Sequence, residues 1–282
     1  MKHLIKYLLF GLLAFSGHTL FAQRTFKVLS YNILEGMKTD KTEGKQEFVS
    51  WLKLQDPDVF AIQEANGFTP KTLQELAESY GHKYSVLLKE TGYPTAITSK
   101  HPIENAEKFT DKMTHGFIVA EILDYNFVVL HLNPHSYIKK RAEMKTVLDS
   151  IKTKNIGKKL LMMGDFNSYS PLYRDNFEDG IMQSSLRKRE LTSNGKLKYL
   201  VDGEIDFEVQ QAILDMGLVD VIYKLETENP TKAKSINPQK HKIDYIYCSK
   251  DIQSKIISGN FIQDNFTKTH SDHIPIVIEL KK

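Results

Sequence analysis

Short apolar runs that each end in polar residues recur along most of this 282-residue chain. Residues 26–34, 58–63 and 127–132 are rich in Val, Ile, Leu and Phe, and each run has the length of a strand. A strand that is buried on both faces reads as a continuous apolar run of this kind. The chain is therefore expected to bury several strands and to place polar side chains where those strands end.

The remaining pattern is typical of an α/β chain. Further strands are predicted at residues 95–99, 117–122, 159–163, 242–248, 256–262 and 274–280. Helices are predicted at residues 45–54, 70–80, 137–152 and 206–216. Two stretches, residues 164–203 and 227–241, show no regular pattern, and we expect each to be irregular. A stretch of that length is typical of a lid or substrate loop, or of a plain surface insertion.

The first 22 residues have the layout of a secretory signal peptide. Lys2 and Lys6 precede an apolar run over residues 7–15, and small and polar residues lead on to Ala22. The run is shorter than the ~20 apolar residues that a membrane-spanning helix needs. We expect cleavage after Ala22, a secreted or periplasmic product, and a mature domain over residues 23–282. A retained N-terminal anchor is the alternative.

The charge of the mature chain is close to zero. Removing Lys2 and Lys6 from the 38 basic residues leaves 36 against 35 acidic residues. A strongly basic face, which binding to duplex nucleic acid normally uses, does not follow from these totals. The single cysteine, Cys248, excludes an intrachain disulfide and lies in an apolar run, so it is expected in the core.

Four carboxylates stand at or beside the ends of the apolar runs, next to imidazole and carboxamide groups. The carboxylates are Glu64, Asp165, Asp244 and Asp272, and their neighbours are His131, His273, Asn32 and Asn167. Oxygen-rich ligation without thiolates favours Mg²⁺, Mn²⁺ or Ca²⁺ over structural zinc. Hydrolysis at phosphorus needs such a cation, a group that orients water, and donors for the developing charge. Together these residues indicate metal-assisted phosphoester hydrolysis, although any one of them alone is more typical of a helix cap or a salt bridge.

The order of the segments resembles the motif set of the endonuclease/exonuclease/phosphatase superfamily. The matching segments are Ser30-Tyr31-Asn32, Ile62-Gln63-Glu64, Val129-Leu130-His131-Leu132, Met163-Gly164-Asp165-Phe166-Asn167, Lys242-Ile243-Asp244-Tyr245-Ile246 and Ser271-Asp272-His273-Ile274-Pro275. The resemblance covers nearly all of the mature chain. It implies a single-domain α/β (α+β) fold, a four-layer sandwich of two packed mixed β-sheets flanked by helices. The active site is then expected at one edge of the two sheets.

The resemblance also implies a role for each motif residue. Glu64 is expected to be the principal metal ligand, with Asn32 beside it and Asp272 as a further ligand, and the ion is expected to be Mg²⁺, Mn²⁺ or Ca²⁺. Asp165 is expected to orient or activate the attacking water, and Asn167 to hold a phosphate oxygen.

The histidines complete the expected machinery. His273 is expected to contact the phosphate or to act as the base, with its imidazole oriented by Asp244. His131 is expected to hydrogen-bond the phosphoryl group or to protonate the leaving oxygen. The implied reaction is in-line attack of water on phosphorus without a covalent intermediate.

Several alternatives remain open from the sequence. His135 is a second phosphate contact or a loop residue, and Arg141 reaches the substrate or joins Lys139, Lys140 and Lys145 on a solvated helix face. The substrate is a nucleic acid, a phospholipid headgroup or a phosphorylated metabolite, and the enzyme is expected to be a monomer. A secreted nuclease is the alternative within the family, and a non-catalytic binding module on the same fold is the alternative of another class.

Overall fold

The structure is a computed structural model that describes residues 25–234 and 242–281. The expected signal peptide lies outside the described residues, as do residues 235–241 of the second irregular stretch. The described part of that stretch is not irregular, because it contains the end of α7 (Val221–Glu228), a 3₁₀ helix (Pro230–Lys232) and β12 (Ala233–Lys234). In the described part of the chain, no helix has both the length and the apolar character that crossing a membrane requires.

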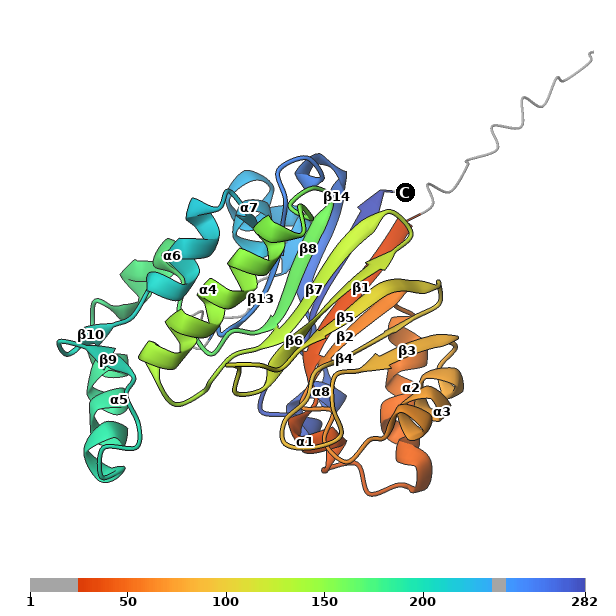
Figure 1. Cartoon of the computed structure of the whole chain (residues 1–282), viewed down its shortest axis with the longest axis horizontal. Helices are drawn as coiled ribbons and strands as arrows, with labels where there is room; N and C mark the ends of the chain where they lie inside the picture. The colour runs from red at the N-terminus through yellow and green to blue at the C-terminus, as the bar shows by residue number, and fades with distance from the viewer. Residues whose placement is uncertain (1–24, 235–241, 282) are drawn as a thin grey trace, which may run out of the picture.

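Two mixed β-sheets pack against each other (Figure 1). In the described chain, one sheet has the strand order β12 (Ala233–Lys234), β14 (Ile256–Phe261), β15 (Ile276–Lys281), β1 (Thr25–Asn32), β2 (Val59–Gln63), β4 (Ala96–Ser99) and β3 (Tyr84–Leu87). The other sheet has the order β11 (Val219–Asp220), β13 (Asp244–Cys248), β8 (Leu160–Asp165), β7 (Tyr125–His131), β6 (Gly116–Ile122) and β5 (Ile103–Phe109). Near the middle of each sheet, one pair of strands is parallel, β1 with β2 and β7 with β8.

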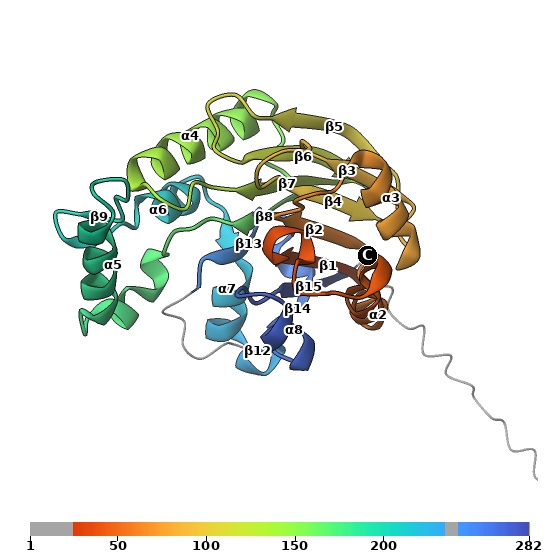
Figure 2. The same ribbon diagram turned by 90° about the horizontal axis from the view of Figure 1, so that it is seen from below.

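Helices cover the outer face of each sheet (Figure 2). The first sheet carries α2 (Gln46–Gln55) and α3 (Pro70–Ser79), and the second carries α4 (Tyr137–Thr153) and α6 (Glu208–Asp215). Thr69 caps α3, because its hydroxyl accepts a hydrogen bond from the amide of Thr72 at 3.2 Å. The expected four-layer sandwich in one domain is therefore confirmed.

The inner layer between the sheets is apolar. Val28 and Ile97 of the first sheet pack in one cluster with Val129 and Ile246 of the second, and all four are fully buried. Alternate residues of the same strands point outward, so Leu29 packs beneath α2 and Leu130 packs beneath α4. This two-sided burial explains why the strands read as continuous apolar runs.

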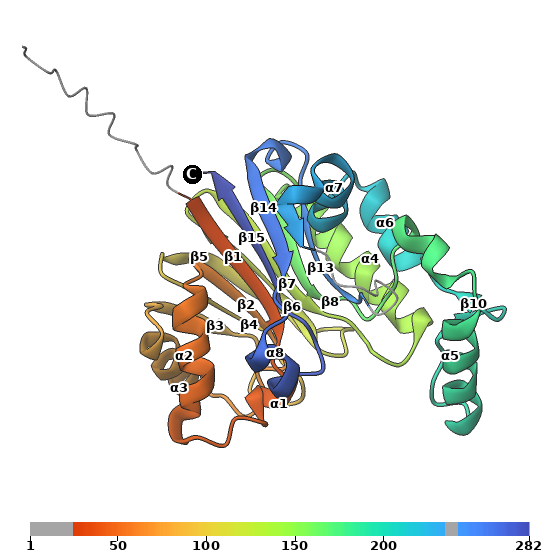
Figure 3. The same cartoon turned by 180° about the vertical axis from the view of Figure 1, so that it is seen from behind.

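The predicted strands and helices are confirmed, with shifts of a few residues at their ends. The expectation that residues 164–203 are irregular is wrong. This stretch contains a 3₁₀ helix, η2 (Pro171–Phe177), and a regular helix, α5 (Ile181–Thr192). With the hairpin of β9 (Leu200–Val201) and β10 (Glu204–Ile205), α5 projects from one side of the sandwich (Figures 1 and 3).

Other elements have weak sequence patterns and were not predicted. They are β3, β5, α1 (Leu34–Met37), α7 (Val221–Glu228) and α8 (Asn265–His270). The edge strand β5 illustrates the reason, because its interior residues are exposed and charged or small, so no apolar run or alternation marks it.

Candidate active site

Asp165 lies at the centre of the cluster of motif residues. It is the last residue of β8, where it is paired in register with His131 of β7 on one side and with Asp244 of β13 on the other. The side chain is almost fully buried. Its Oδ1 accepts a hydrogen bond from the amide of Asn167 at 2.9 Å, and its Oδ2 accepts one from Asn32 Nδ2 at 3.1 Å. Asn32 belongs to the other sheet, so this contact joins the two sheets at the site.

Gly164 allows β7 and β8 to approach each other just before Asp165. Its φ is +143°, and a Cβ atom at this position would lie 1.9 Å from the carbonyl oxygen of Leu130. A side chain cannot be accommodated against a neighbouring backbone at that distance. The glycine of the Gly-Asp-Phe-Asn segment is therefore required by the strand pairing that places Asp165.

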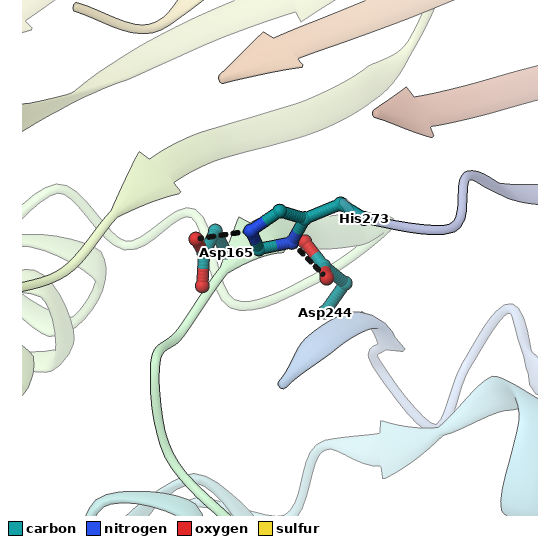
Figure 4. A group of neighbouring side chains, drawn as sticks. All are labelled: Asp165, Asp244 and His273. Carbon is teal, nitrogen blue, oxygen red and sulfur yellow. Dashed lines mark hydrogen bonds and ion pairs between the residues drawn. The ribbon is translucent and has the colours of Figure 1, made fainter. Parts of the chain in front are cut away.

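His273 lies between two carboxylates (Figure 4). Its Nδ1 is 2.7 Å from Asp244 Oδ2, and its Nε2 is 3.7 Å from Asp165 Oδ2. Burial alone would lower the pKa of His273, but the charges of Asp244 and Asp165 outweigh it and raise the pKa to about 10. Burial raises the pKa of Asp165 to about 7, although the charge of His273 opposes this shift. The predicted pairing of His273 with Asp244 is present.

Glu64 and Asn32 form the side of the site contributed by the first sheet. Asn32 Nδ2 lies 3.2 Å from Glu64 Oε1, and the other oxygen of Glu64 accepts a hydrogen bond from the amide of Glu35 at 2.8 Å. Glu64 follows β2 directly with φ +59°, a conformation that turns the chain at the strand end. Glu35, which the sequence did not single out, thus helps to fix the orientation of the Glu64 carboxylate.

His131 joins the cluster from β7. Its Nε2 is 3.4 Å from Asp165 Oδ2, and its ring stacks on His115 with 4.2 Å between the ring centroids. Burial lowers the pKa of His131 and also that of His115, which falls to about 4. Both rings are therefore neutral at neutral pH. His115 was not predicted at this site, because it belongs to none of the motif segments.

Lys140 is a second residue that the sequence did not identify. The prediction of a solvated helix face is wrong for this residue, because Lys140 is 6% exposed. Its ammonium donates a hydrogen bond to the carbonyl oxygen of Asn167 at 2.5 Å, and the carboxamide of Asn167 donates one to the carbonyl of Leu132 at 3.1 Å. Burial lowers the pKa of Lys140 to about 8. Lys140 of α4 thus supports the turn that carries Asn167.

The remaining candidates lie at the rim of the cluster. Asp272 and His135 line a cleft beside His273, and both side chains are exposed. Arg141 is paired with Asp206, with 2.7 Å between Nη2 and Oδ1, so its guanidinium already has a carboxylate partner.

The donor groups of the cluster suit a hard divalent cation. Asp165, Asp244 and His273 bring potential ligand atoms within 4.8 Å of one another, and Glu64 and Asn32 add oxygen donors beside Asp165. Because the hydrogen bond between His273 Nδ1 and Asp244 Oδ2 already occupies two of these atoms, the Glu64 side is the better position for an ion. Burial is the main cause of the raised pKa of Asp165, and the nearby charge of Asp244 adds to it, so a cation bound here would stabilise the ionised carboxylate.

Comparisons with known proteins agree with this arrangement. A family model described as "Endonuclease/Exonuclease/phosphatase family" matches residues 29–273, which include all the candidate site residues. Among curated proteins, no significant match was found.

Solved structures show the same fold at low sequence identity. An AP endonuclease from Archaeoglobus fulgidus aligns with a TM-score of 0.63 at 16% identity, covering 91% of this chain and 100% of that one. A 3′ phosphatase from Neisseria, solved with a product DNA hairpin, aligns with a TM-score of 0.62 at 17% identity and the same coverage. A protein described as endonuclease/exonuclease/phosphatase from Beutenbergia cavernae aligns with a TM-score of 0.58 at 15% identity, covering 92% of this chain and 72% of that one.

Proposed function

This chain belongs to the endonuclease/exonuclease/phosphatase family, and on that basis we propose that it is an exported, Mg²⁺-dependent phosphoesterase that acts by in-line attack of water. Divalent-metal-dependent phosphoester hydrolysis is the activity of the family. The choice of ion, the export and the course of the reaction are our proposals. The observation that supports the course of the reaction is the contact of Asp165 with Asn32 of the first sheet and with His273, which is itself paired with Asp244 of the second sheet.

Glu64 and Asn32 would hold the metal, with Asp272 as a further ligand. A hard divalent ion bound there would neutralise charge on the phosphoryl oxygens and on the leaving oxygen. The three residues offer oxygen donors, which Mg²⁺ prefers, and Mn²⁺ or Ca²⁺ would also fit this donor type.

The side chains around this position have the remaining roles in the proposed reaction. Asp165 orients the attacking water, and the water proton is accepted within the Asp165–His273 pair. Asp244 keeps Nδ1 of His273 engaged, so that Nε2 faces the phosphoryl group. Asn167 and His131 supply donors for the charge that develops on phosphorus-bound oxygens. No side chain of the cluster is required as a nucleophile, which agrees with direct attack by water.

The charge of the chain bears on the nature of the substrate. We propose a phosphodiester or phosphomonoester of a small molecule, because the near-neutral charge of the mature chain does not favour binding to duplex DNA. A secreted nuclease is the second candidate, since similar folds are found in an AP endonuclease and in a 3′ phosphatase solved with DNA.

Hydrolysis of bis(p-nitrophenyl) phosphate tests the proposal. After treatment with EDTA the protein should be inactive, and Mg²⁺ or Mn²⁺ should restore turnover. Glu64→Gln and His273→Ala should each reduce kcat/KM by about 100-fold or more. Glu75→Gln, at an exposed position on α3, removes the same charge away from the site and should leave turnover unchanged.

The outcomes separate the competing functions. Activity that persists in EDTA or in both site variants would contradict the mechanism. Inactivity toward a panel of mono- and diesters would favour the non-catalytic binding module. Plasmid nicking, sphingomyelin cleavage and phosphate release, measured side by side, would distinguish nuclease, phospholipid and metabolite substrates.

The proposals on export and on assembly have their own tests. N-terminal sequencing of the protein from the medium or periplasm should show a mature chain that begins at Gln23. Sedimentation of that product should give the mass of a monomer. An uncleaved chain in the membrane fraction would instead support the retained anchor.

A further inference from the structure

A cleft of about 290 Å³ extends from the candidate active site toward α5. One end is lined by Asn167 and His273, where the reacting phosphate is proposed to lie. The other end is lined by Leu186 and Arg189 of α5 and by Tyr199. Pockets that hold whole small-molecule ligands have volumes of roughly 300–1,000 Å³. The volume of this cleft is therefore close to that of a small-molecule site.

The segment that forms the far wall is built as a structured unit. Leu186, Tyr199 and Phe177 belong to a small apolar cluster of their own, separate from the main core. Glu190 ties α5 to β9, because its Oε1 accepts hydrogen bonds from the amides of Tyr199 and Leu200, the latter at 2.8 Å. The wall is thus held in place by packing and by hydrogen bonds in the absence of substrate.

The charges along the cleft favour a second anion at its far end. The guanidinium of Arg189 lies over the ring of Tyr199, 4.7 Å from its centroid, and forms no ion pair among the described residues. Asp206, which also lines the cleft, is already neutralised by Arg141. Arg189 can therefore direct its donors at a ligand, and a planar guanidinium suits phosphate or carboxylate.

We propose that this cleft selects small phosphoesters whose organic part carries a second anionic group, which Arg189 binds. The reacting phosphate lies at His273, the organic part lies along Tyr169 and Leu186, and the second phosphate or carboxylate reaches Arg189. This inference rests on the proposed phosphoesterase function and adds the substrate class to it.

Two chromogenic diesters test the inference. Thymidine 5′-(p-nitrophenyl phosphate) and its 3′-phosphorylated derivative share the scissile bond and the nucleoside, and differ in one anionic group. The protein with Mg²⁺ should show a kcat/KM about tenfold higher for the 3′-phosphorylated diester, the size expected of one charge-assisted hydrogen bond. Arg189→Gln should bring the ratio of the two kcat/KM values close to one, mainly through KM.

Lys188→Gln is the matched control. It removes the same charge from the adjacent, exposed position of α5, which does not line the cleft, and it should keep the wild-type ratio. Because a ratio does not depend on the fraction of folded protein, partial unfolding of a variant cannot imitate the effect. A wild-type ratio near one, or an equal loss of preference in the two variants, would overturn the inference.

A binding measurement separates this inference from the proposed function. Thymidine 3′,5′-bisphosphate, titrated calorimetrically into the protein without metal, should bind about tenfold more weakly to Arg189→Gln than to the wild type or Lys188→Gln. If no ester is hydrolysed but this difference appears, the proposed hydrolytic function is wrong, whereas binding of the second anion by Arg189 is supported. If esters are hydrolysed and the three proteins bind the bisphosphate equally, the role of Arg189 is wrong and the hydrolytic function is unaffected.

Discussion

His273 shows how neighbouring residues determine what one side chain can do. Its ring has a carboxylate at each nitrogen, Asp244 at 2.7 Å and Asp165 at 3.7 Å. The shorter contact fixes the ring orientation and leaves Nε2 facing the site. The longer contact leaves space in which a phosphoryl oxygen or a water can be bound. In the proposed mechanism, Asp244 is therefore a positioning residue, whereas Asp165 and His273 face the reacting atoms.

Replacement of Asp244 by Asn tests whether Asp244 acts by orienting the imidazole of His273. The variant has the same shape, but its carboxamide can present a donor to Nδ1 and so favour the wrong tautomer. We expect kcat to fall by about 100-fold or more, with a much smaller change in KM. Steady-state kinetics on bis(p-nitrophenyl) phosphate measure both. Asp111→Asn, at an exposed position, should have wild-type kinetics; an equal loss in the two variants would contradict the role of Asp244.

The burial of Lys140 could not be predicted from the sequence. Lys139, Lys140 and Lys145 on one helix indicate a solvated face, and Lys139 and Lys145 are indeed exposed. Lys140 is buried because the turn after β8 docks on the first turns of α4, a contact between segments 27 residues apart. No pattern of apolar and polar residues along the helix indicates such a contact. The motif residues, by contrast, could be predicted because their order along the chain is itself informative.

Replacement of Lys140 by Met should impair catalysis through Asn167. The methionine fills the same space but leaves the carbonyl of Asn167 without its donor, so the turn that carries Asn167 loses its support. We expect kcat/KM to fall about tenfold or more, which corresponds to one lost buried hydrogen bond to a charged group. Lys139→Met, one residue earlier and exposed, is the control. Unchanged kinetics in the Lys140 variant would show that the turn holds without it.

At the scale of elements, the buried strands were predictable and the peripheral elements were not. Strands such as β1, β7 and β8 bury both faces, so their apolar runs are unambiguous. The edge strand β5 has exposed residues along most of its length, and α5 buries Met182 and Leu186 against a small satellite cluster. Weak burial gives weak patterns, which is why the sequence predicts no regular element for the wall of the proposed substrate cleft.

Replacement of Gly164 by Ala tests the strand pairing that places Asp165. The new Cβ would lie 1.9 Å from the carbonyl oxygen of Leu130, so β7 and β8 must separate or the backbone must distort. We expect the free energy of unfolding to fall by more than about 3 kcal/mol, measured by urea denaturation. Gly157→Ala, which meets no atom within 4 Å, should change it by less than about 1 kcal/mol. Similar stability of the two variants would contradict the close approach.

At the scale of the whole molecule, the site exists only where the two sheets meet. Asn32 ends β1 and Glu64 follows β2 in the first sheet, and Asp165 and Asp244 lie on strands of the second. The family resemblance predicted which residues to expect at the site, because it orders them along the chain, and the structure places Asn32, Glu64 and Asp165 next to one another. The resemblance could not predict their distances, since these depend on how two separately formed sheets pack through one apolar layer.

The same packing buries imidazole rings that are neutral in the folded protein. His82 is 1% exposed, and its Nε2 lies 2.8 Å from the carbonyl oxygen of Pro57, to which it donates. Its Nδ1 lies 2.8 Å from the hydroxyl of Thr98 and accepts from it. Burial lowers the pKa of His82 to about 4, and it lowers the pKa of His115 to about 4 as well. Each ring must be kept neutral for the fold to keep its full stability.

Acid should therefore destabilise the fold above the range in which carboxylates titrate. The unfolded chain takes up a proton at each histidine near pH 6.5, whereas folded His82 does so only near pH 4, so its contribution is complete above about pH 6.5 and is lost as the pH falls toward 4. For His82 alone the loss is on the order of 3 kcal/mol. Urea denaturation at pH 7.5, 6.5, 5.5 and 4.5 measures it. His82→Gln should be less stable than the wild type at pH 7.5 but lose less stability over this range, because glutamine has no proton to gain; equal losses in the two proteins would show that folding does not lower the pKa of His82.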